Sequence, residues 1–239
     1  RGKPARMLVI TCAADSSSGA SSGCAWGMAR VLRQEHAALH VQSVDVLRHG
    51  IGGSFGASLQ ASATEAETAC SGEERFASRL RACMAASLPS AALTCTWTCP
   101  SNVYGITGGH GGLGLRSAAS LVESGASRIV LSSRSGHVGR DGQGLAAQLM
   151  SLGDAARAIA CDVGDAGDAV FLLMRLAPVG ILHAAGVLRD RMFRSMAAND
   201  VHAVFVPKAV AASHVIGASS RFPLEACGLL SSITSTFGT

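Results

Sequence analysis

The chain has few aromatic and few charged residues, and each shortage excludes a class of protein. Among its 239 residues, aromatic side chains make up 4%, with a single Tyr, and charged side chains make up 15%. The Lys and Arg residues are scattered rather than clustered, so the net charge of +4 does not indicate a nucleic-acid partner. No apolar run has the length that a bilayer span requires, so no membrane span is predicted. The hydrophobic fraction of 48% predicts a buried α/β core.

Metal-site and leader patterns are also missing. None of the eight cysteines forms a CxxC pair or joins a histidine at zinc spacing, so no metal site is predicted. Most lie in apolar or Ala-rich segments, which favours buried, reduced thiols and a cytoplasmic location, with an organelle as the alternative. The start, Arg1–Arg6, has no initiating Met and lacks the apolar core of a signal peptide, so we expect a longer parent protein.

A glycine-rich segment is the most informative feature that is present. It follows a predicted strand at 103–106, precedes a helical pattern that begins at Leu115, and is followed by a second predicted strand at 128–133. This order predicts a dinucleotide site, because glycines let the backbone approach a pyrophosphate and a helix N-terminus favours its charge. The loop residues expected to contact the cofactor are Thr107, Gly108, Gly109, His110, Gly111, Gly112, Leu113 and Gly114.

The end of the second strand indicates which dinucleotide is bound. An acidic residue there would accept hydrogen bonds from the ribose hydroxyls of NAD, but this chain has Ser133 followed by Arg134. A guanidinium beside hydroxyls suits a 2′-phosphate, so Ser133 and Arg134 predict NADPH as the cofactor. The alternative is that Arg134 is a solvated loop residue.

Strands and helices alternate along the chain, which indicates an α/β fold. We predict a Rossmann-like doubly wound parallel sheet, preceded by a smaller, truncated Rossmann-like subdomain. The structural subdomain without a cofactor site is placed at 1–100, and the NADP(H)-binding subdomain at 101–239. In the first, strands are predicted at 7–11 and 41–46 and helices at 25–35 and 73–86. In the second, further strands are predicted at 156–163, 179–186 and 227–232, and helices at 146–152, 166–176 and 199–216.

The second half resembles the ketoreductase domain of modular polyketide synthases, part of the short-chain dehydrogenase/reductase superfamily. The resemblance rests on TGGHGGLG at 107–114, LSSR at 131–134, CDV at 161–163, HAAGVL at 183–188, PK at 207–208 and LLSS at 229–232. In the first half, CAWGMARV at 24–31 is similar to the structural subdomain of that family. The resemblance implies NADPH-dependent reduction of a β-ketoacyl thioester on an acyl carrier protein. It also implies neighbouring domains of a polyketide or fatty acid synthase.

The resemblance implies catalytic roles for two residues. In this superfamily a Tyr supplies a proton, a Ser binds the substrate carbonyl, and a Lys lowers the pKa of the Tyr. Ser232 matches the Ser and Lys208 the Lys; the alternatives are a polar strand end and a solvated helix lysine. The Tyr would follow thirteen residues after the Ser, beyond Thr239, so we expect the sequence to end before it. The one Tyr present, Tyr104, precedes the glycine loop and is expected to lie out of reach of the carbonyl.

Residues after the third and fourth predicted strands complete the expected cofactor site. Asp162 and Val163 match the adenine contact of the family, and a strand-end Asp that caps a turn is the alternative. Ala184, Ala185 and Gly186 are small where the backbone passes the cofactor ribose, although tight packing of strand on helix explains small residues equally well.

One residue bears on stereochemistry. Asp190 ends the segment Leu188-Arg189-Asp190, at the place of an Asp that marks reductases giving the D-configured hydroxyl. Phe237 stands where the opposite class has a Trp, which agrees, whereas Arg189 departs from the pattern. The alternative is a loop carboxylate paired with Arg189 or Arg191.

Two histidines and two other functions remain to be weighed. His110 stands where Thr or Ser is commoner in the family and is interpreted as a neutral loop histidine, and His183 as a core histidine. A free-standing short-chain dehydrogenase is one alternative function, which the Trp26 segment disfavours. A non-catalytic, cofactor-binding structural domain of a synthase is the other.

Overall fold

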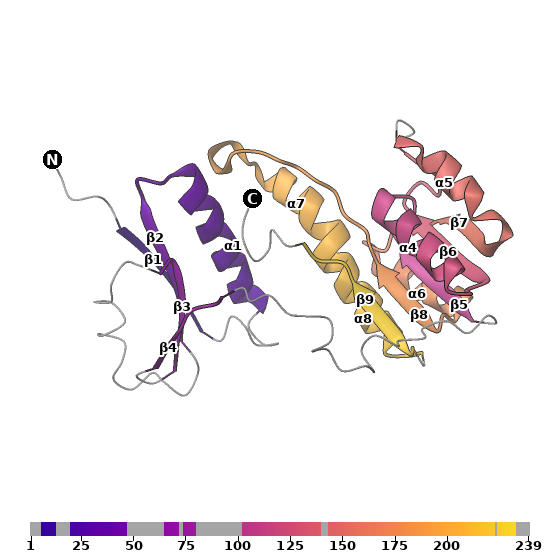
Figure 1. Ribbon diagram of the computed structural model, residues 1–239, viewed down its shortest axis with the longest axis horizontal. Coiled ribbons are helices and arrows are strands. Elements are labelled where there is room, and N and C mark those ends of the chain that lie inside the picture. Colours follow the sequence, from indigo (N-terminus) through magenta and orange to yellow (C-terminus); the bar gives the residue numbers. More distant parts are fainter. Residues whose placement is uncertain are drawn as a thin grey trace. The chain divides into compact units, whose positions relative to one another are not determined.

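The chain divides into two compact units. The computed structural model describes residues 6–12, 20–46, 65–71, 74–79, 102–139, 143–222 and 224–232. The first unit lies within Arg1–Ser87 and also takes in Met192–Ser195 and Ser231–Thr239; the second comprises Leu88–Arg191 and Met196–Leu230. Each unit has its own sheet (Figure 1). The predicted domain boundary at residue 100 lies outside the described residues.

The first unit is a small mixed α/β layer. Its elements are β1 (Arg6–Cys12), α1 (Ala20–Glu35), β2 (His40–Val46), β3 (Glu67–Ser71) and β4 (Glu74–Phe76). The sheet has the order β1-β2-β3-β4, in which β4 is antiparallel to β3 and the other pairs are parallel. The buried residues Ala29 and Leu32 of α1 pack on Val41 of β2. This arrangement confirms the predicted smaller Rossmann-like layer.

The helix predicted at 73–86 is wrong at its beginning. Glu74–Phe76 forms β4, whose backbone pairs with β3 from Ala69 to Ser71. The apolar spacing that suggested a helix started at Phe76, but this residue is half exposed and serves the hairpin. Strand pairing between segments overrides a local periodicity of one or two turns. The rest of that predicted helix, from residue 80, lies outside the described residues.

A chain of buried hydrogen bonds lies at the carboxyl ends of β1 and β2 in the first unit. The indole Nε1 of Trp26 donates to Thr11 Oγ1 at 2.8 Å, and this hydroxyl donates to Asp45 Oδ1 at 2.8 Å. Arg30 lies 5.7 Å from the centre of the Trp26 ring and makes two hydrogen bonds of 2.7 Å to Glu67. Protein side chains therefore occupy the carboxyl ends of β1 and β2.

The second unit contains an all-parallel sheet. Its strands are β5 (Val103–Thr107), β6 (Arg128–Ser133), β7 (Ala156–Ala160), β8 (Gly180–His183) and β9 (Ala226–Leu229). Their order, β7-β6-β5-β8-β9, is the doubly wound Rossmann order, which confirms the predicted fold class. The strand order reverses between β5 and β8. A ligand site is expected at the carboxyl ends of these strands.

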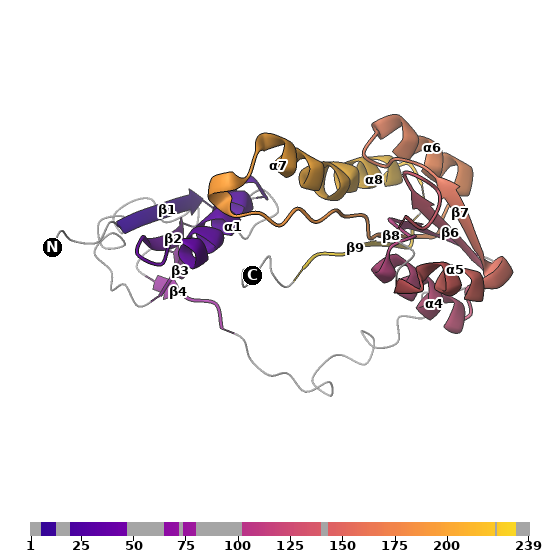
Figure 2. The same cartoon turned by 90° about the horizontal axis from the view of Figure 1, so that it is seen from above.

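Helices cover both faces of this sheet. They are α4 (Gly112–Glu123), α5 (Leu145–Ser151), α6 (Ala166–Leu176) and α8 (Ala211–Ser219). Helix α7 (Ala198–Phe205), which buries no residue, leads into α8 through the π-helical turn η5 (Val206–Val210). Short 3₁₀ turns lie at η3 (Gly153–Ala155) and at η4 (Phe193–Ser195), the latter within the first unit. Figure 2 shows α4 and α5 on one side of the sheet and α6 and α8 on the other.

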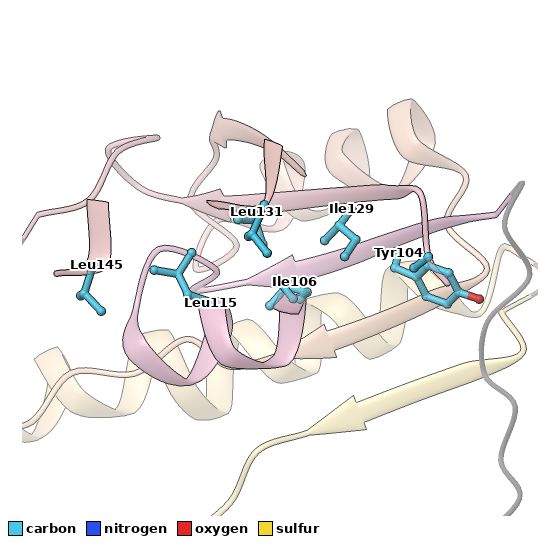
Figure 3. Packing of buried hydrophobic residues seen from close by; sticks show 9 residues of the cluster. Tyr104, Ile106, Leu115, Ile129, Leu131 and Leu145 are labelled. Carbon is cyan, nitrogen blue, oxygen red and sulfur yellow. The ribbon is translucent and has the colours of Figure 1, made fainter. Parts of the chain in front are cut away.

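Two apolar clusters hold these layers together. In one, Leu115 of α4 and Leu145 of α5 pack against strand residues such as Ile106 and Leu131 (Figure 3). Tyr104 belongs to this cluster and is 3% exposed. It stands near the start of β5, and the glycine loop begins at the other end of that strand. The chain's one tyrosine is therefore a core residue.

The run from α7 through α8 corrects the expectation that no apolar segment is long enough to span a membrane. Ala198–Ser219 is a helix of 22 residues with a mean hydropathy of 1.3, long and apolar enough to cross a membrane by length and composition. Part of this apolar character serves the core, because Val215 and Ala218 are buried in a cluster with Leu173 of α6. The helix widens into a π-turn at Pro207, which has no N–H to continue the α-helical ladder.

Candidate nucleotide-binding and catalytic site

A cavity of about 630 Å³ opens at the carboxyl ends of the parallel strands of the second unit. Its wall is formed by the glycine loop, by the segments that follow β6, β7 and β8, and by Pro207 of η5. Ten of the predicted cofactor residues line it: Gly108, His110, Gly111, Ser133, Arg134, Asp162, Val163, Ala184, Ala185 and Gly186. The volume is within the usual range of small-molecule sites.

A second cavity, of about 480 Å³, lies between α6 and the sheet. Its wall includes Val103 and Arg128, which begin their strands, and Phe171 and Arg175 of α6. It lacks the glycine loop and extends to the amino ends of the strands. Ligands of open α/β sheets bind at the carboxyl ends, so the first cavity is the candidate site.

The glycine loop is shaped for close approach. Gly108 has a φ of +68°, and a Cβ at this position would lie 2.5 Å from Ala185 Cα, so no larger residue fits without moving backbone. The loop is tied to the sheet because Gly109 N–H donates to Ser132 C=O at 3.0 Å. Helix α4 has Gly111 as its N-cap and no side-chain cap. Its first N–H groups are therefore left for an anion.

The remaining loop residues do not line the cavity. Thr107 is fully buried, and Leu113 is 65% exposed. Gly109 and Gly114 face one another, since a Cβ on Gly114 would lie 2.6 Å from Gly109 Cα. These loop residues therefore shape the loop and the start of α4 and do not form the cavity wall. They are Thr107, Gly109, Gly112, Leu113 and Gly114.

The turn after β6 presents Arg134 to the cavity. Ser133 Oγ accepts from Gly136 N–H at 3.1 Å, and His137 Nδ1 donates to the Ser135 carbonyl at 2.9 Å. Within the part of the chain that the structure describes, Arg134 has neither a hydrogen bond nor an ion pair. The turn is thus held by its own polar groups and leaves a guanidinium available to a ligand.

Asp162, after β7, caps a turn. Its Oδ1 accepts from Gly164 N–H at 3.0 Å, and its own N–H donates to Asp168 Oδ2 at 3.1 Å. The neighbouring Cys161 thiol has its pKa raised to about 11, first by burial and then by nearby carboxylates. Asp162 thus caps a turn, which the sequence offered as one of two alternatives. The contact of Asp162 and Val163 with the adenine stays a prediction.

His183 joins the glycine-loop strand to the helix that carries Lys208. Its Nε2 lies 3.2 Å from the Lys208 carbonyl, and its Nδ1 lies 2.6 Å from Thr107 Oγ1. Because a carbonyl only accepts, Nε2 carries the proton and Nδ1 accepts from the Thr107 hydroxyl. Burial lowers the pKa of His183, which keeps the ring neutral. Sequence analysis interpreted His183 as a core histidine and missed this link.

Lys208 lies beside the cavity. A Cβ on Gly186, which lines the cavity, would lie 2.9 Å from Lys208 Cε. Gly186 therefore provides the space in which the lysine side chain crosses the segment after β8. The π-turn and the His183 contact fix the backbone at this point, so the predicted lysine is positioned from two sides.

Ser232 and Asp190 are not among the residues that line the cavity. Ser232 is exposed, follows β9 by three residues and groups with the first unit, so the structure does not place it in one unit with Lys208. Asp190 is exposed and has no hydrogen bond or ion pair among the described residues. Arg191 pairs with Asp200 at 3.2 Å instead. Phe237 lies outside the described residues.

His110 is 5% exposed, although it lines the cavity. Within the described part of the chain, neither of its ring nitrogens has a hydrogen-bond partner. Burial, and the nearby His137, lower the pKa of His110, so its ring is neutral near pH 7. Among the described residues, no group of three His, Cys, Asp or Glu side chains is placed to hold a metal ion.

A family model and curated relatives both assign the chain to the same family. Residues 102–239 match the KR domain family. Polyketide synthase GfsA of Streptomyces halstedii is 34% identical over 175 residues, which cover 70% of this chain and 2% of GfsA. A putative inactive phenolphthiocerol synthesis polyketide synthase, Pks1 of Mycobacterium tuberculosis, is 36% identical over 139 residues, 56% of this chain and 9% of Pks1.

Solved structures agree along nearly the whole chain. An A1-type ketoreductase superposes with a TM-score of 0.78 at 26% identity, covering 99% of this chain and 52% of that chain. The present chain therefore spans about half of a solved ketoreductase and a small part of the curated synthases.

Proposed function

The chain belongs to the ketoreductase (KR) domain family of modular type I polyketide synthases, and we propose that its second unit binds NADPH for the reduction of a β-ketoacyl thioester. The product is the β-hydroxyacyl thioester, and the substrate is carried on the phosphopantetheine of an acyl carrier protein. In this proposal the chain works beside neighbouring synthase domains in the cytoplasm. The observation that carries it is the cavity at the strand ends, with a glycine cradle on one side and, on the other, Arg134, which pairs with none of the described residues.

The residues present fit the cofactor. The N–H groups of the glycine loop and the uncapped start of α4 suit a pyrophosphate, and Arg134 with Ser133 suits a 2′-phosphate. Asp162 and Val163 would contact the adenine, and Ala184, Ala185 and Gly186 the ribose next to the nicotinamide. When bound, NADPH supplies the hydride.

The protein's own groups would handle charge and proton. The Lys208 ammonium would hold a ribose hydroxyl and lower the pKa of a phenol proton donor, and His183 fixes the lysine backbone for this task. Ser232 would donate to the carbonyl oxygen as it gains negative charge. Tyr104 is not the proton donor of this proposal, because it is buried in the core. Asp190, exposed and unpaired among the described residues, would act in stereocontrol toward the D-configured hydroxyl.

The cofactor proposal is tested by Arg134→Ala. We expect NADPH binding to weaken by about 1–3 kcal/mol, roughly 5- to 150-fold, because a charge-assisted contact with the 2′-phosphate is lost. NADH lacks this phosphate, so its affinity should not change. Titration of both nucleotides measures the two affinities, and an equal loss for both would contradict the assignment.

The catalytic proposal is tested in the parent synthase domain. Lys208→Ala and Ser232→Ala should each lower turnover by on the order of 10²-fold or more, the scale of losing one electrostatic or acid–base partner. Lys208→Ala should also shift the pH profile to the alkaline side, whereas Ser232→Ala should keep its shape. A second candidate is a non-catalytic, cofactor-binding domain, favoured by the similarity of this chain to the putative inactive synthase Pks1. A parent domain that binds NADPH but reduces no β-ketoacyl thioester would support it.

A further inference from the structure

The buried imidazole of His110 is an unexplained polar group in the wall of the nucleotide cavity. It is 5% exposed, and none of the residues that the structure describes forms a hydrogen bond with either ring nitrogen. A buried polar group without a partner is costly, and native structures retain few of them. His183, also buried, shows the contrast, since both of its nitrogens are bonded. The His110 ring is therefore left for a group that the protein itself does not supply.

The surroundings of His110 favour an anion. Arg134 and His137 line the same cavity from the turn after β6, and the uncapped start of α4 follows His110 directly. The opposite wall carries one acidic residue, Asp162, one Oδ of which already accepts a backbone N–H, and the high-pKa thiol of Cys161. The segment after β8 and Pro207 carry no charge themselves, but the Lys208 side chain passes beside Gly186 and adds a positive charge at that side. A phosphate group is the anion that such a helix start and guanidinium select.

We propose that His110 is a phosphate contact that gains a proton when a nucleotide binds, so that acid strengthens nucleotide binding in this cavity. This inference rests on the proposed NADPH site and adds a pH response to it. The phosphate is either the pyrophosphate, next to the glycine loop, or the 2′-phosphate, next to Arg134. A Thr or Ser at this position could donate a hydrogen bond but could not titrate.

The direction follows from charge. In the free protein, burial and His137 lower the pKa of His110, so the ring is neutral. A phosphate beside the ring stabilises the imidazolium and raises that pKa. Between the two values binding takes up a proton, and the affinity rises by at most about tenfold for each unit that the pH falls. Above the bound value and below the free value His110 no longer makes the affinity vary with pH.

The test measures proton uptake on binding. NADPH and NADH are titrated calorimetrically into the 239-residue chain from pH 6 to 8, in two buffers of different ionisation enthalpy. His110→Asn and His110→Thr remove the titrating group. His137→Gln is the matched control, because His137 lines the same cavity but its Nδ1 is bonded to a carbonyl. The 2′-phosphate itself gains a proton near pH 6, and this contribution is common to all variants.

We expect the wild-type chain and His137→Gln to take up more protons on binding than either His110 variant, and this excess is the contribution of His110. An excess with both nucleotides identifies the pyrophosphate, and an excess with NADPH alone identifies the 2′-phosphate. NADPH binding with equal proton uptake in wild type and His110→Asn would overturn this inference and leave the proposed function intact, as would loss of uptake in His137→Gln alone. Failure of the folded wild-type chain to bind NADPH at any pH would overturn both. Circular dichroism of each variant establishes that it is folded.

Discussion

Replacement of Gly108 by Ala tests the cradle, and Gly144 provides a matched control. Gly108 has a φ of +68° and Gly144 a φ of +67°, so an alanine at either position meets the same backbone strain. That strain costs about 1–2 kcal/mol for a residue with a Cβ. The two positions differ in their neighbours, because a Cβ at Gly144 has nothing within 4 Å. Any additional loss in Gly108→Ala therefore reports the close approach.

The additional loss can be estimated from the contacts at Gly108. A Cβ there would lie 2.5 Å from Ala185 Cα, 2.6 Å from Ala185 N and 2.8 Å from the Ala184 carbonyl carbon. All three atoms are backbone, so no side-chain rotation relieves the overlap and the segment after β8 has to move. Overpacking of this kind costs about 1–3 kcal/mol. We expect Gly108→Ala to lose about 2–5 kcal/mol of unfolding free energy and Gly144→Ala about 1–2 kcal/mol.

Two measurements check the difference. Urea unfolding at pH 7.5 gives the free energies of unfolding, and native-state hydrogen exchange follows the Ala184 amide, which donates to the Thr107 carbonyl at 2.9 Å. Gly108→Ala should speed the exchange of the Ala184 amide and abolish NADPH binding. Gly144→Ala should leave both the exchange of this amide and NADPH binding unchanged. Equal losses in the two variants, within about 0.5 kcal/mol, would refute the close approach and with it the cradle.

Other residues give separate predictions. Burial lowers the pKa of His183 below the usual 6.5, so the unfolded chain binds the proton more readily and stability falls as the pH drops below that value. The slope is at most about 1.4 kcal/mol per pH unit, and urea midpoints from pH 7.5 to 5.5 should vary less in His183→Leu. Trp26→Phe removes the donor to Thr11 and should cost about 1 kcal/mol in thermal unfolding of the first unit. With a pKa of about 11, Cys161 should be alkylated about tenfold faster per pH unit between pH 8 and 10, as read by mass spectrometry.

The doubly wound sheet was predictable because its signals are local. The glycine loop stands between a strand and a helix, and the residues that begin and end α6, Ala166 and Leu176, agree with the predicted range. Strand β4 was not predictable in this way, since Glu74–Phe76 has no strand pattern of its own and is held by pairing with β3. The predicted helix at 199–216 does continue through Pro207. The sequence did not reveal the π-turn at this point, which accommodates the missing N–H of Pro207 within the continuous helix.

The residues of the cavity wall could be predicted from the sequence, but the environments of its histidines could not. Residue type and spacing placed Gly108, Arg134 and Gly186 in one site, because parallel strands bring their carboxyl ends together. What each histidine does depends on its partners in three dimensions. His110 follows β5, His183 is the last residue of β8, and both are buried. Among the described residues, however, His110 has no hydrogen-bond partner and His183 has two. No feature of the sequence distinguishes these environments.

The two units show why topology alone does not give cofactor binding. Both place parallel strands beside a helix, so both have strand ends where a nucleotide could lie. In the first unit, Trp26 donates to Thr11 and Thr11 to the buried Asp45, and these side chains fill that end. In the second, Gly108 and its neighbours leave a cavity of about 630 Å³ at the equivalent place. Function therefore follows from the side chains at the strand ends, which are bonded to one another in the first unit and surround a glycine-lined cavity in the second.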